Sequence, residues 1–532
     1  MSEKSKLKKQ KHSLANTRIL RFLLVILLLS GLFFRFFNLD GKVYGGDEIF
    51  TSLQISGHTL AEMKQQLPNG HVISIKDLQK YQYPNPDKSA IDTINSLVLE
   101  DSQNAPLYYI IAQLWVQCFG NSVAVTRSLS AFINLLAFPC LYWLCQELFE
   151  SSLVGWIAIA LMAVSPTHVL YAQEARSYGL WILIILLSSA SLLRALRLKT
   201  RASWCIYAAT VPLGLYTHLF FGLVGIGHGI YVAVIERLRL SRTLTLYLLA
   251  SLAGVLAFMP WLLVMIISPP NAQTVDWMNT KSTIFSTLIR WAGIISRTFL
   301  DLGVSPSGSS TSMLFLSPII LILIILITYS VYFICRSTPK QVWLFILTLI
   351  GVTGLALLLP DLILGQRRGS TRYILPCILG IQLSVAYLIS SQGFLVSANN
   401  RGRKLWQFVT VMLISMGLLS CLISSQAEIW WNKAPERNEH NPQMAKIVNQ
   451  ATKPLLISDT DDLISVQAFG HLLAPKVKLQ LVVQPAIPTI TNGFTDVFLF
   501  NPSDSLRSGL ERVYKSKIKL IYASLWKIED QK

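Results

Sequence analysis

Two neighbouring carboxylates, Asp47 and Glu48, follow the first apolar run of the chain, within the stretch 44–51 (YGGDEIFT). A carboxylate at such a place can act as a general base toward a hydroxyl group, which typically accelerates a reaction by about 10²- to 10⁴-fold. Adjacent acids are also common in solvated loops. The pair taken alone therefore favours a solvated loop, and its chemistry depends on what else the fold brings to it.

A second ionisable pair, Glu174 and Arg176, lies in the stretch 171–178 (YAQEARSY) between two apolar runs that leave almost no loop. Both side chains must lie within a membrane or at its rim, where ionisable groups are costly and are usually paired or functional. A mutual ion pair explains them as well as a functional site does. Tyr178 begins the second of the two runs.

Three arginines gather late in the chain, in the stretch 366–373 (QRRGSTRY), where Arg368 and Arg372 are followed by Tyr373. The guanidinium fork suits bidentate binding of a phosphate group. In the topology described below these cations lie on the outer side, against the charge bias that the rest of the chain obeys. A lipid phosphate is the expected ligand, and contact with ordinary anionic headgroups is the plainer alternative.

A fourth polar stretch, 101–109 (DSQNAPLYY), contains Asn104 and Tyr109 around a proline. Pro106 is typical of the first turn of a helix. The polar groups before it would then point toward the membrane surface. Plain capping of that helix by one of them is the alternative.

The elements that position these residues belong to a strongly apolar chain, with 52% hydrophobic and 14% charged residues in 532. A soluble protein would carry about a quarter charged residues. The apolar runs have the length of about twenty residues that crosses a bilayer. The fold class expected is mainly α, a polytopic transmembrane bundle of about eleven crossings. The expected spans are 18–38, 123–146, 152–168, 178–197, 203–217, 219–236, 245–268, 313–335, 342–360, 373–391 and 405–425.

The formal net charge of +18 is distributed as a membrane protein requires. Basic residues cluster at the ends of the apolar runs, which is the positive-inside pattern, so no nucleic-acid partner is inferred. With a cytoplasmic basic tail, residues 1–17, every basic cluster outside the arginine stretch falls inside. The segments 40–104, 268–312 and 426–532 then fall outside, and we expect a multi-pass protein of the plasma (inner) membrane.

Shorter apolar stretches are interpreted differently from the spans. Leu107–Phe119 is too short for a crossing, and its aromatic residues suit a helix lying in the outer interface. A similar interfacial helix is expected around Phe285–Phe299. The seven cysteines avoid the long polar segments, which excludes a disulfide framework and a Cys-rich metal site there.

The predicted organisation has a transmembrane domain, 18–425, whose first outer loop, 40–104, carries the acids. The final segment, 426–532, changes character, with short β-prone runs separated by turns and charges. It predicts a small extracytoplasmic α/β domain. The expected strands are Leu455–Ser458, Val477–Val483, Val497–Phe500 and Ile518–Tyr522.

Taken together and in this order, the four stretches resemble the GT-C superfamily of membrane glycosyltransferases, in the branch of the protein O-mannosyltransferases and aminoarabinose transferases. The resemblance covers roughly Asp40 to Tyr387 and not the C-terminal domain. Each motif alone is weak, and the ordered set is specific. The matching residues are Asp47-Glu48, Asn104-Ala105-Pro106-Leu107-Tyr108-Tyr109, Gln173-Glu174-Ala175-Arg176-Ser177-Tyr178 and Arg372-Tyr373, with Phe119-Gly120-Asn121-Ser122, Arg127 and Tyr216-Thr217-His218 beside them.

The resemblance implies a sugar donor carried on a polyprenyl phosphate and a lipid, glycan or protein acceptor. Asn104-Ala105 departs from the His-Pro of many relatives, and an amide is a poorer metal ligand than imidazole. A divalent metal therefore stays an open question, with Glu48 and His218 as weak candidate ligands. An isolated histidine at a helix end is more often packed than ligating.

The expected reaction is an inverting single displacement on the extracytoplasmic face. A phosphodiester departs as a stable anion, so one catalytic carboxylate suffices, and Asp47 is the expected base. Arg176, Arg368 and Arg372 would hold the phosphate, and Glu174 would orient Arg176 or contact the sugar. The competing hypothesis is a lipid or solute transporter, which would favour charges at the bilayer midplane and repeated halves.

Overall fold

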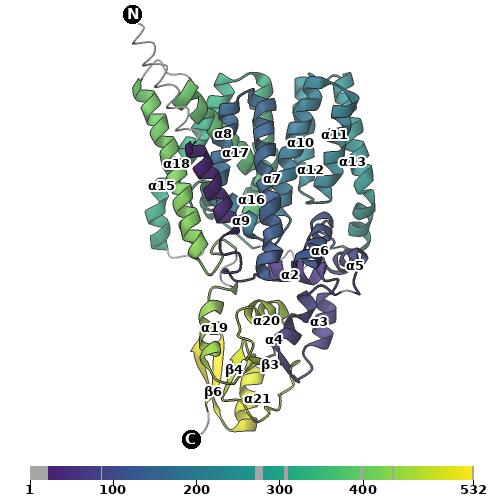
Figure 1. The fold of residues 1–532 in the computed structure, drawn as a ribbon, viewed down its shortest axis with the longest axis vertical. Coiled ribbons are helices and arrows are strands. Elements are labelled where there is room, and N and C mark those ends of the chain that lie inside the picture. Colours follow the sequence, from purple (N-terminus) through teal and green to yellow (C-terminus); the bar gives the residue numbers. More distant parts are fainter. Residues whose placement is uncertain are drawn as a thin grey trace, which may run out of the picture. The chain divides into compact units, whose positions relative to one another are not determined.

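The computed structural model describes residues 22–85, 87–269, 280–304, 310–395, 400–433, 437–459 and 461–529. The predicted basic tail, 1–17, and the beginning of the first predicted span lie outside these residues. The chain forms two compact units (Figure 1). The helical unit comprises Met1–Phe37, Gln103–Ala105 and Arg127–Ser425, and the α/β unit comprises Asn38–Ser102, Pro106–Thr126 and Gln426–Lys532.

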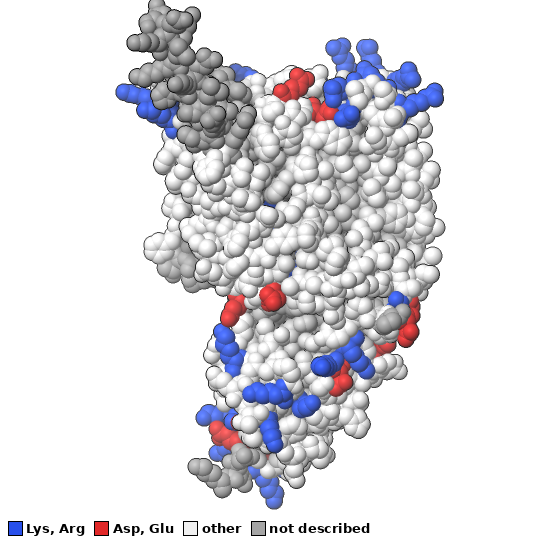
Figure 2. Space-filling view, viewed as in Figure 1, with Lys and Arg blue, Asp and Glu red and all other residues white. Residues whose placement is uncertain are grey.

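The helical unit is a bundle of apolar helices, as the runs of hydrophobic residues predict. Its elements are an N-terminal helix (Phe22–Phe36), α7 (Val123–Phe149), α8 (Ser152–Ala163), α9 (Pro166–Gln173), α10 (Tyr178–Leu198), α11 (Arg201–Leu215), α12 (Phe221–Ile235), α13 (Arg242–Ile267), α14 (Ile284–Ser296), α15 (Ser310–Ser337), α16 (Lys340–Ile363), the 3₁₀ turn η4 (Thr371–Tyr373), α17 (Leu375–Ile389), the π-helical turn η5 (Ser390–Leu395) and α18 (Asn400–Gln426). On the face shown in Figure 2, Lys and Arg gather at one end of α10–α13, and the length of these helices is almost free of charge.

Within the described residues, seven helices are long and apolar enough to cross a membrane, or eight if α8 and α9 form one span. Such helices are those of an integral membrane protein, and the mainly α fold class is confirmed. The described N-terminal helix and the helices α11 and α12 are shorter, so the expected count of about eleven crossings stays a prediction. The expected interfacial segments are indeed short helices, α6 (Leu107–Phe119) and α14.

The predicted span 152–168 is broken in the structure, since α8 and α9 meet at an angle of 62°. Pro166 begins α9 and keeps Ser165 extended, at φ −71° and ψ 119°, because proline disfavours a helical residue before it. The fully buried Arg35 guanidinium donates to the carbonyl oxygens of Met162 (3.1 Å) and Ala163 (2.9 Å), at the end of α8. Arg35 thus adds side-chain donors to the last carbonyl groups of α8, of which that of Met162 also accepts from the backbone N–H of Ser165 at 3.4 Å.

The α/β unit is built on a six-stranded mixed sheet in the order β1-β3-β2-β4-β6-β5. The parallel strands β3, β2 and β4 lie at its centre, and β6 and β5 extend it as an antiparallel pair. The strands are β1 (Val72–Ser74), β2 (Pro454–Ser458), β3 (Lys478–Leu481), β4 (Asp496–Phe500), β5 (Lys517–Tyr522) and β6 (Leu525–Glu529), and the helices of the C-terminal segment are α19 (Asn441–Gln450), α20 (Leu463–Gly470) and α21 (Asp504–Tyr514). The four expected strands are confirmed, whereas β1 and β6 were not predicted.

Strand β1 comes from the segment 40–104, which was predicted to be the first outer loop, and pairs antiparallel with β3, with Val72 opposite Gln480. The loop that we grouped with the transmembrane domain therefore shares a sheet with the C-terminal segment. A three-residue strand carries almost no periodicity, so only the long-range pairing defines it. The remaining elements of this loop and of the segment after it are α2 (Gly46–Ile55), α3 (Leu60–Gln66), α4 (Ile75–Gln79), η1 (Lys80–Gln82), α5 (Ala90–Glu100) and α6.

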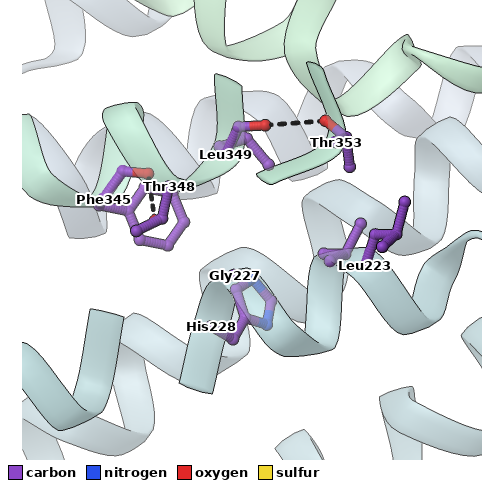
Figure 3. Close-up of a pocket in the computed structure, with 8 residues that line it drawn as sticks. Leu223, Gly227, His228, Phe345, Thr348, Leu349 and Thr353 are labelled. Carbon is purple, nitrogen blue, oxygen red and sulfur yellow. Dashed lines mark hydrogen bonds between the residues drawn. The ribbon is translucent and has the colours of Figure 1, made fainter. Parts of the chain in front are cut away.

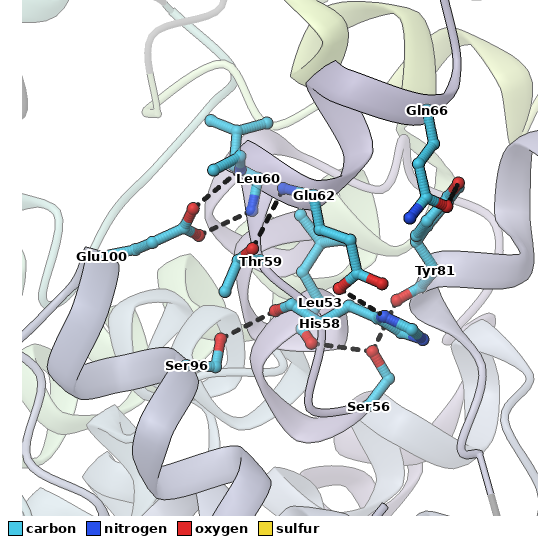
Figure 4. Close-up of polar contacts among 11 residues, drawn as sticks. Leu53, Ser56, His58, Thr59, Leu60, Glu62, Gln66, Tyr81, Ser96 and Glu100 are labelled. Carbon is cyan, nitrogen blue, oxygen red and sulfur yellow. Dashed lines mark hydrogen bonds and ion pairs between the residues drawn. The ribbon is translucent and has the colours of Figure 1, made fainter.

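Polar contacts fix the helices of the first loop to one another (Figure 4). The Glu100 carboxylate accepts hydrogen bonds from the backbone N–H groups of Leu60 (2.7 Å) and Ala61 (2.8 Å), at the N-terminus of α3. The Ser96 hydroxyl of α5 donates to the carbonyl of His58, just after α2. These contacts cap a helix end and tie α5 to the connection between α2 and α3.

Candidate functional site

The junction between α9 and α10 carries Glu174 and Arg176, and it is buried throughout. Glu174 ends α9 in an extended conformation, and the backbone N–H of Arg176 donates to the carbonyl of Glu174 at 2.7 Å. The Ser130 hydroxyl of α7 donates to the carbonyl of Arg176 at 3.2 Å. The side-chain amide of Gln173 donates to the carbonyls of Phe34 (2.8 Å) and Phe37 (3.0 Å). Hydrogen bonds with α7 and with the end of the N-terminal helix and the residue after it therefore fix the direction of this junction.

Arg372 joins the late arginine stretch to this junction. It lies in η4, and its Nη1 donates to the hydroxyl of Tyr178 at 3.2 Å, across 194 positions of sequence. Its guanidinium also lies 5.5 Å from the ring centre of Tyr373. The Tyr171 hydroxyl is close enough to Glu174 and Arg372 for both charges to act on it. Two of the sequence stretches thus meet in one place.

Aromatic rings surround these cations. The His218 ring, in the turn between α11 and α12, stacks on Trp181 with centroids 4.1 Å apart and planes 8° apart. Phe220 packs on Tyr373 at 4.9 Å, and Tyr171 packs on Tyr178 at 5.1 Å. Trp181 is fully buried and was not predicted to belong to the site. Its spacing of three residues from Tyr178, which places both on one face of α10, was the available signal.

The charge state of His218 follows from these neighbours. Burial, together with the positive charges of Arg176 and Arg372, lowers the pKa of the imidazole from 6.5 to about 3. The ring is therefore neutral at pH 7, and its Nδ1 accepts a hydrogen bond from the N–H of Phe220 at 3.2 Å. The positive charge of this cluster therefore lies on the arginines. Arginine stays protonated at any physiological pH, so these side chains can bind a phosphate throughout that range.

Arg368 is held by its backbone, whose N–H donates to the carboxylate of Asp361 at 2.6 Å, and the residue is partly exposed. The helical unit therefore brings together six of the predicted residues (Glu174, Arg176, Tyr178, His218, Arg372 and Tyr373) and holds Arg368 in the loop that leads to them. Asn104 lies in the short link Gln103–Ala105, which groups with this unit.

The predicted acids belong to the α/β unit, in the first turn of α2. Glu48 is buried, and its carboxylate accepts a hydrogen bond from the backbone N–H of Gly45 at 3.3 Å. It therefore helps to cap its own helix, as an acid in a first turn commonly does. Asp47 is partly exposed, and Tyr109 is buried in α6, which packs against α2.

The segment around the acids is also held by the C-terminal part of the α/β unit. The ring of Tyr44 lies 4.9 Å from that of His471, and its hydroxyl shares a 2.7 Å hydrogen bond with Ser52 of α2. A Cβ atom at Gly46 would lie 3.2 Å from Cγ2 of Ile464, in α20. Helix α2 therefore packs closely against α20.

Other features of the structure do not add to this site. Within the described ranges, no group of three or more His, Cys, Asp or Glu side chains could hold a metal ion. A small pocket between α12 and α16 is lined by residues that include His228 and Phe345 but none of the predicted residues (Figure 3). Its cavity volume of about 10 Å³ holds at most one water molecule, so this pocket does not bind a lipid-linked sugar.

Comparison with solved structures shows what this architecture is similar to. ArnT from Cupriavidus metallidurans, bound to undecaprenyl phosphate, matches with a TM-score of 0.53 and 14% identity, over 95% of this chain and 97% of that one. The same protein in its apo state matches with a TM-score of 0.52 and 13% identity, over 97% and 98%. No family model matches the sequence, and no curated protein matches it. These matches show that this chain shares the fold of ArnT, an aminoarabinose transferase, as the resemblance of the motifs implied for the fold.

Proposed function

We propose that this protein transfers a sugar from a polyprenyl-phosphate-linked donor to an acceptor on the extracytoplasmic face of the membrane. The observation that carries the proposal is the contact of Arg372 with Tyr178. It brings Arg372 to the junction that carries Arg176, next to the neutral His218, which stacks on Trp181. Fixed cations at the ends of apolar helices suit a lipid phosphate whose tail stays in the bilayer. ArnT, which shares the fold, was solved with such a lipid bound.

The arginines supply the larger part of the catalysis in this proposal. As the bond between the anomeric carbon and the phosphate oxygen breaks, its electron pair stays on the phosphate. Arg176, Arg368 and Arg372 stabilise that charge. Because these donors are already fixed in place, they need not rearrange as the charge develops. Glu174 orients Arg176 or contacts the sugar. Tyr178 fixes Arg372 through its hydroxyl, and Tyr373 packs beneath the guanidinium.

The acceptor is activated by Asp47 in this proposal. The acceptor hydroxyl attacks the anomeric carbon from the face opposite the phosphate, and its proton passes to Asp47, so the configuration inverts. The partial exposure of Asp47 in the first turn of α2 supports its role as the general base. Glu48 caps the same helix, which favours a positioning role for Glu48. Asn104 and Tyr109 are proposed contacts of the substrates.

A transporter is the second candidate function. The clustering of ionisable residues at the ends of α9 and α10 and in η4, rather than halfway along long helices, favours the transferase.

The decisive experiment incubates the purified protein, in lipid nanodiscs, with a panel of polyprenyl-phosphate sugars and candidate acceptors. We expect sugar release or transfer with one donor class. Asp47→Asn should reduce turnover at least about 100-fold while expression and thermal stability are retained. Wild-type turnover in that variant removes Asp47 from the mechanism. Lipid translocation without any bond cleavage would establish the transporter instead.

A further inference from the structure

The carboxylate of Asp361 is surrounded by hydrogen-bond donors although it lies at the end of an apolar helix. Its side chain is completely buried in the last turns of α16. It accepts from Arg290 Nη2 at 2.7 Å and from Trp291 Nε1 at 3.0 Å, both in α14. It also accepts from the backbone N–H groups of Arg368 (2.6 Å) and Gly369 (3.0 Å). Four donors from two segments therefore converge on one acid.

This placement has a physical cost that the partners offset. A carboxylate near the C-terminus of a helix faces the negative end of the helix dipole. A buried charge must also be paired and hydrogen-bonded to be tolerated. Arg290 supplies the opposite charge, and its Nη1 donates to the carbonyl of Gly369, so it bonds both the acid and the loop. The charge of Arg290 is thus neutralised by Asp361, so Arg290 orders the loop rather than binding a further anion.

The loop between α16 and η4 has little freedom at the same place. A Cβ atom at Gly369 would lie 2.7 Å from the Trp291 ring and 2.8 Å from Asp361 Oδ2, so only glycine fits. Earlier in the loop, the carbonyl of Gly365 accepts from the N–H of Ser282 at 2.8 Å. The loop is thus fixed immediately before Arg372, which contacts Tyr178.

We infer that Asp361 and Arg290 are positioning residues for the donor phosphate. Together they fix the backbone of Arg368 and Gly369 so that the guanidinium groups of Arg368 and Arg372 are held in place before the lipid binds. This role rests on the proposed function. Helix α14 has a function in this inference, because it supplies both Arg290 and Trp291, which contact Asp361.

The test compares Asp361→Asn and Arg290→Lys with the wild-type protein. Each variant keeps the approximate shape but weakens the acceptor or the fork. Hydrogen exchange at residues 366–370 and the rate of trypsin cleavage after Arg367 or Arg368 report the order of the loop without any substrate. We expect faster exchange and cleavage, and a KM for the lipid donor raised by about 10- to 100-fold, with a smaller change in kcat.

The matched control is Glu147→Gln. Glu147 forms a comparable ion pair with Arg197, at 2.8 Å, but at the other end of α10, roughly 30 Å along that helix from Tyr178. This variant should leave loop exchange and the donor KM unchanged. If Asp361→Asn does not fold, Arg290→Lys and Gly369→Ala answer the same question.

The outcomes separate this inference from the proposed function. A loop as protected in Asp361→Asn and Arg290→Lys as in the wild type overturns the inference, and so does a loosened loop with an unchanged donor KM. Arg372→Ala tests the function itself. If donor binding is unaffected in Arg372→Ala, the phosphate site is wrong, even where exchange shows that Asp361 orders the loop.

Discussion

The Nη1 atom of Arg372 lies 3.2 Å from the hydroxyl oxygen of Tyr178, and the tyrosine accepts that hydrogen bond across 194 residues of sequence. The contact fixes a late arginine against the first turn of α10, directly after the junction that carries Glu174 and Arg176. A flexible arginine side chain loses rotamer freedom when it binds a ligand, so a preformed contact reduces the entropy cost of binding.

Tyr178→Phe should therefore weaken donor binding more than it slows the chemical step. The phenyl ring retains the packing against Tyr171, and only the acceptor for Arg372 is lost. Hydrogen bonds to charged groups are worth about 1.5–3 kcal/mol, so we expect a donor KM raised by roughly tenfold or more with kcat within a few-fold. Steady-state kinetics with Arg372→Lys, which loses the fork, should show a larger effect. An unchanged KM in Tyr178→Phe would mean that the contact does not prepare the site.

Arg35→Met should strongly destabilise the protein. The substitution removes the donors to Met162 and Ala163 at the break between α8 and α9, and also the 2.8 Å bond from Nε to Asn134 Oδ1. Each buried acceptor left without a donor costs about 1–3 kcal/mol. We expect a markedly lower midpoint of thermal unfolding, measured in detergent, or a failure to accumulate. Arg239→Met, at an exposed arginine, is the control and should behave like the wild type.

The low pKa of His218 predicts a measurable dependence of stability on pH. Because the folded-state pKa is about 3 and the ordinary value is 6.5, the unfolded chain binds a proton that the folded chain does not between these values. Stability contributed by this group is complete above about pH 6.5 and falls as the pH is lowered, by up to ~1.4 kcal/mol per pH unit. Between pH 7 and pH 5, the midpoint temperature of unfolding should therefore fall less with decreasing pH in His218→Gln than in the wild type. An equal pH dependence of the midpoint in both proteins would show that the pKa of His218 is not lowered by folding.

Much of this architecture could be predicted from the sequence, because membrane helices are recognisable by long apolar runs with few charges, and strands by short β-prone runs bounded by turns. The helix α6 was expected with the bounds that it has, Leu107–Phe119. Features that depend on tertiary contacts could not be predicted. Strand β1 exists only through its pairing with β3, and the ring of Asp361 donors joins α14 to a loop about eighty positions later.

The candidate site shows the same division. Arg176, Arg372 and Tyr178 were recognisable because ionisable and aromatic residues beside apolar runs need a reason to be there. Trp181 was marked only by its spacing of three residues from Tyr178, since a tryptophan in an apolar helix is ordinary. Arg290 carried no signal, since an arginine in a segment that is predicted to lie outside the membrane is also ordinary. Asp361, an isolated acid at the end of an apolar run, could have been singled out by the same rule that selected Glu174.

The packing of α2 on α20 predicts that the C-terminal segment influences the acid helix. Gly46→Val places branched carbon atoms where Ile464 already lies, since even a Cβ atom would stand 3.2 Å from its Cγ2. We expect the displaced α2 to lower kcat by about tenfold, because small misplacements of a catalytic group are costly, while the donor KM changes little. Adding Ile464→Ala makes room for the new side chain and should restore most of the lost turnover, whereas Ile464→Ala alone should remain close to the wild type. A double variant as slow as Gly46→Val would show that the loss arises within α2 itself and not from its contact with α20.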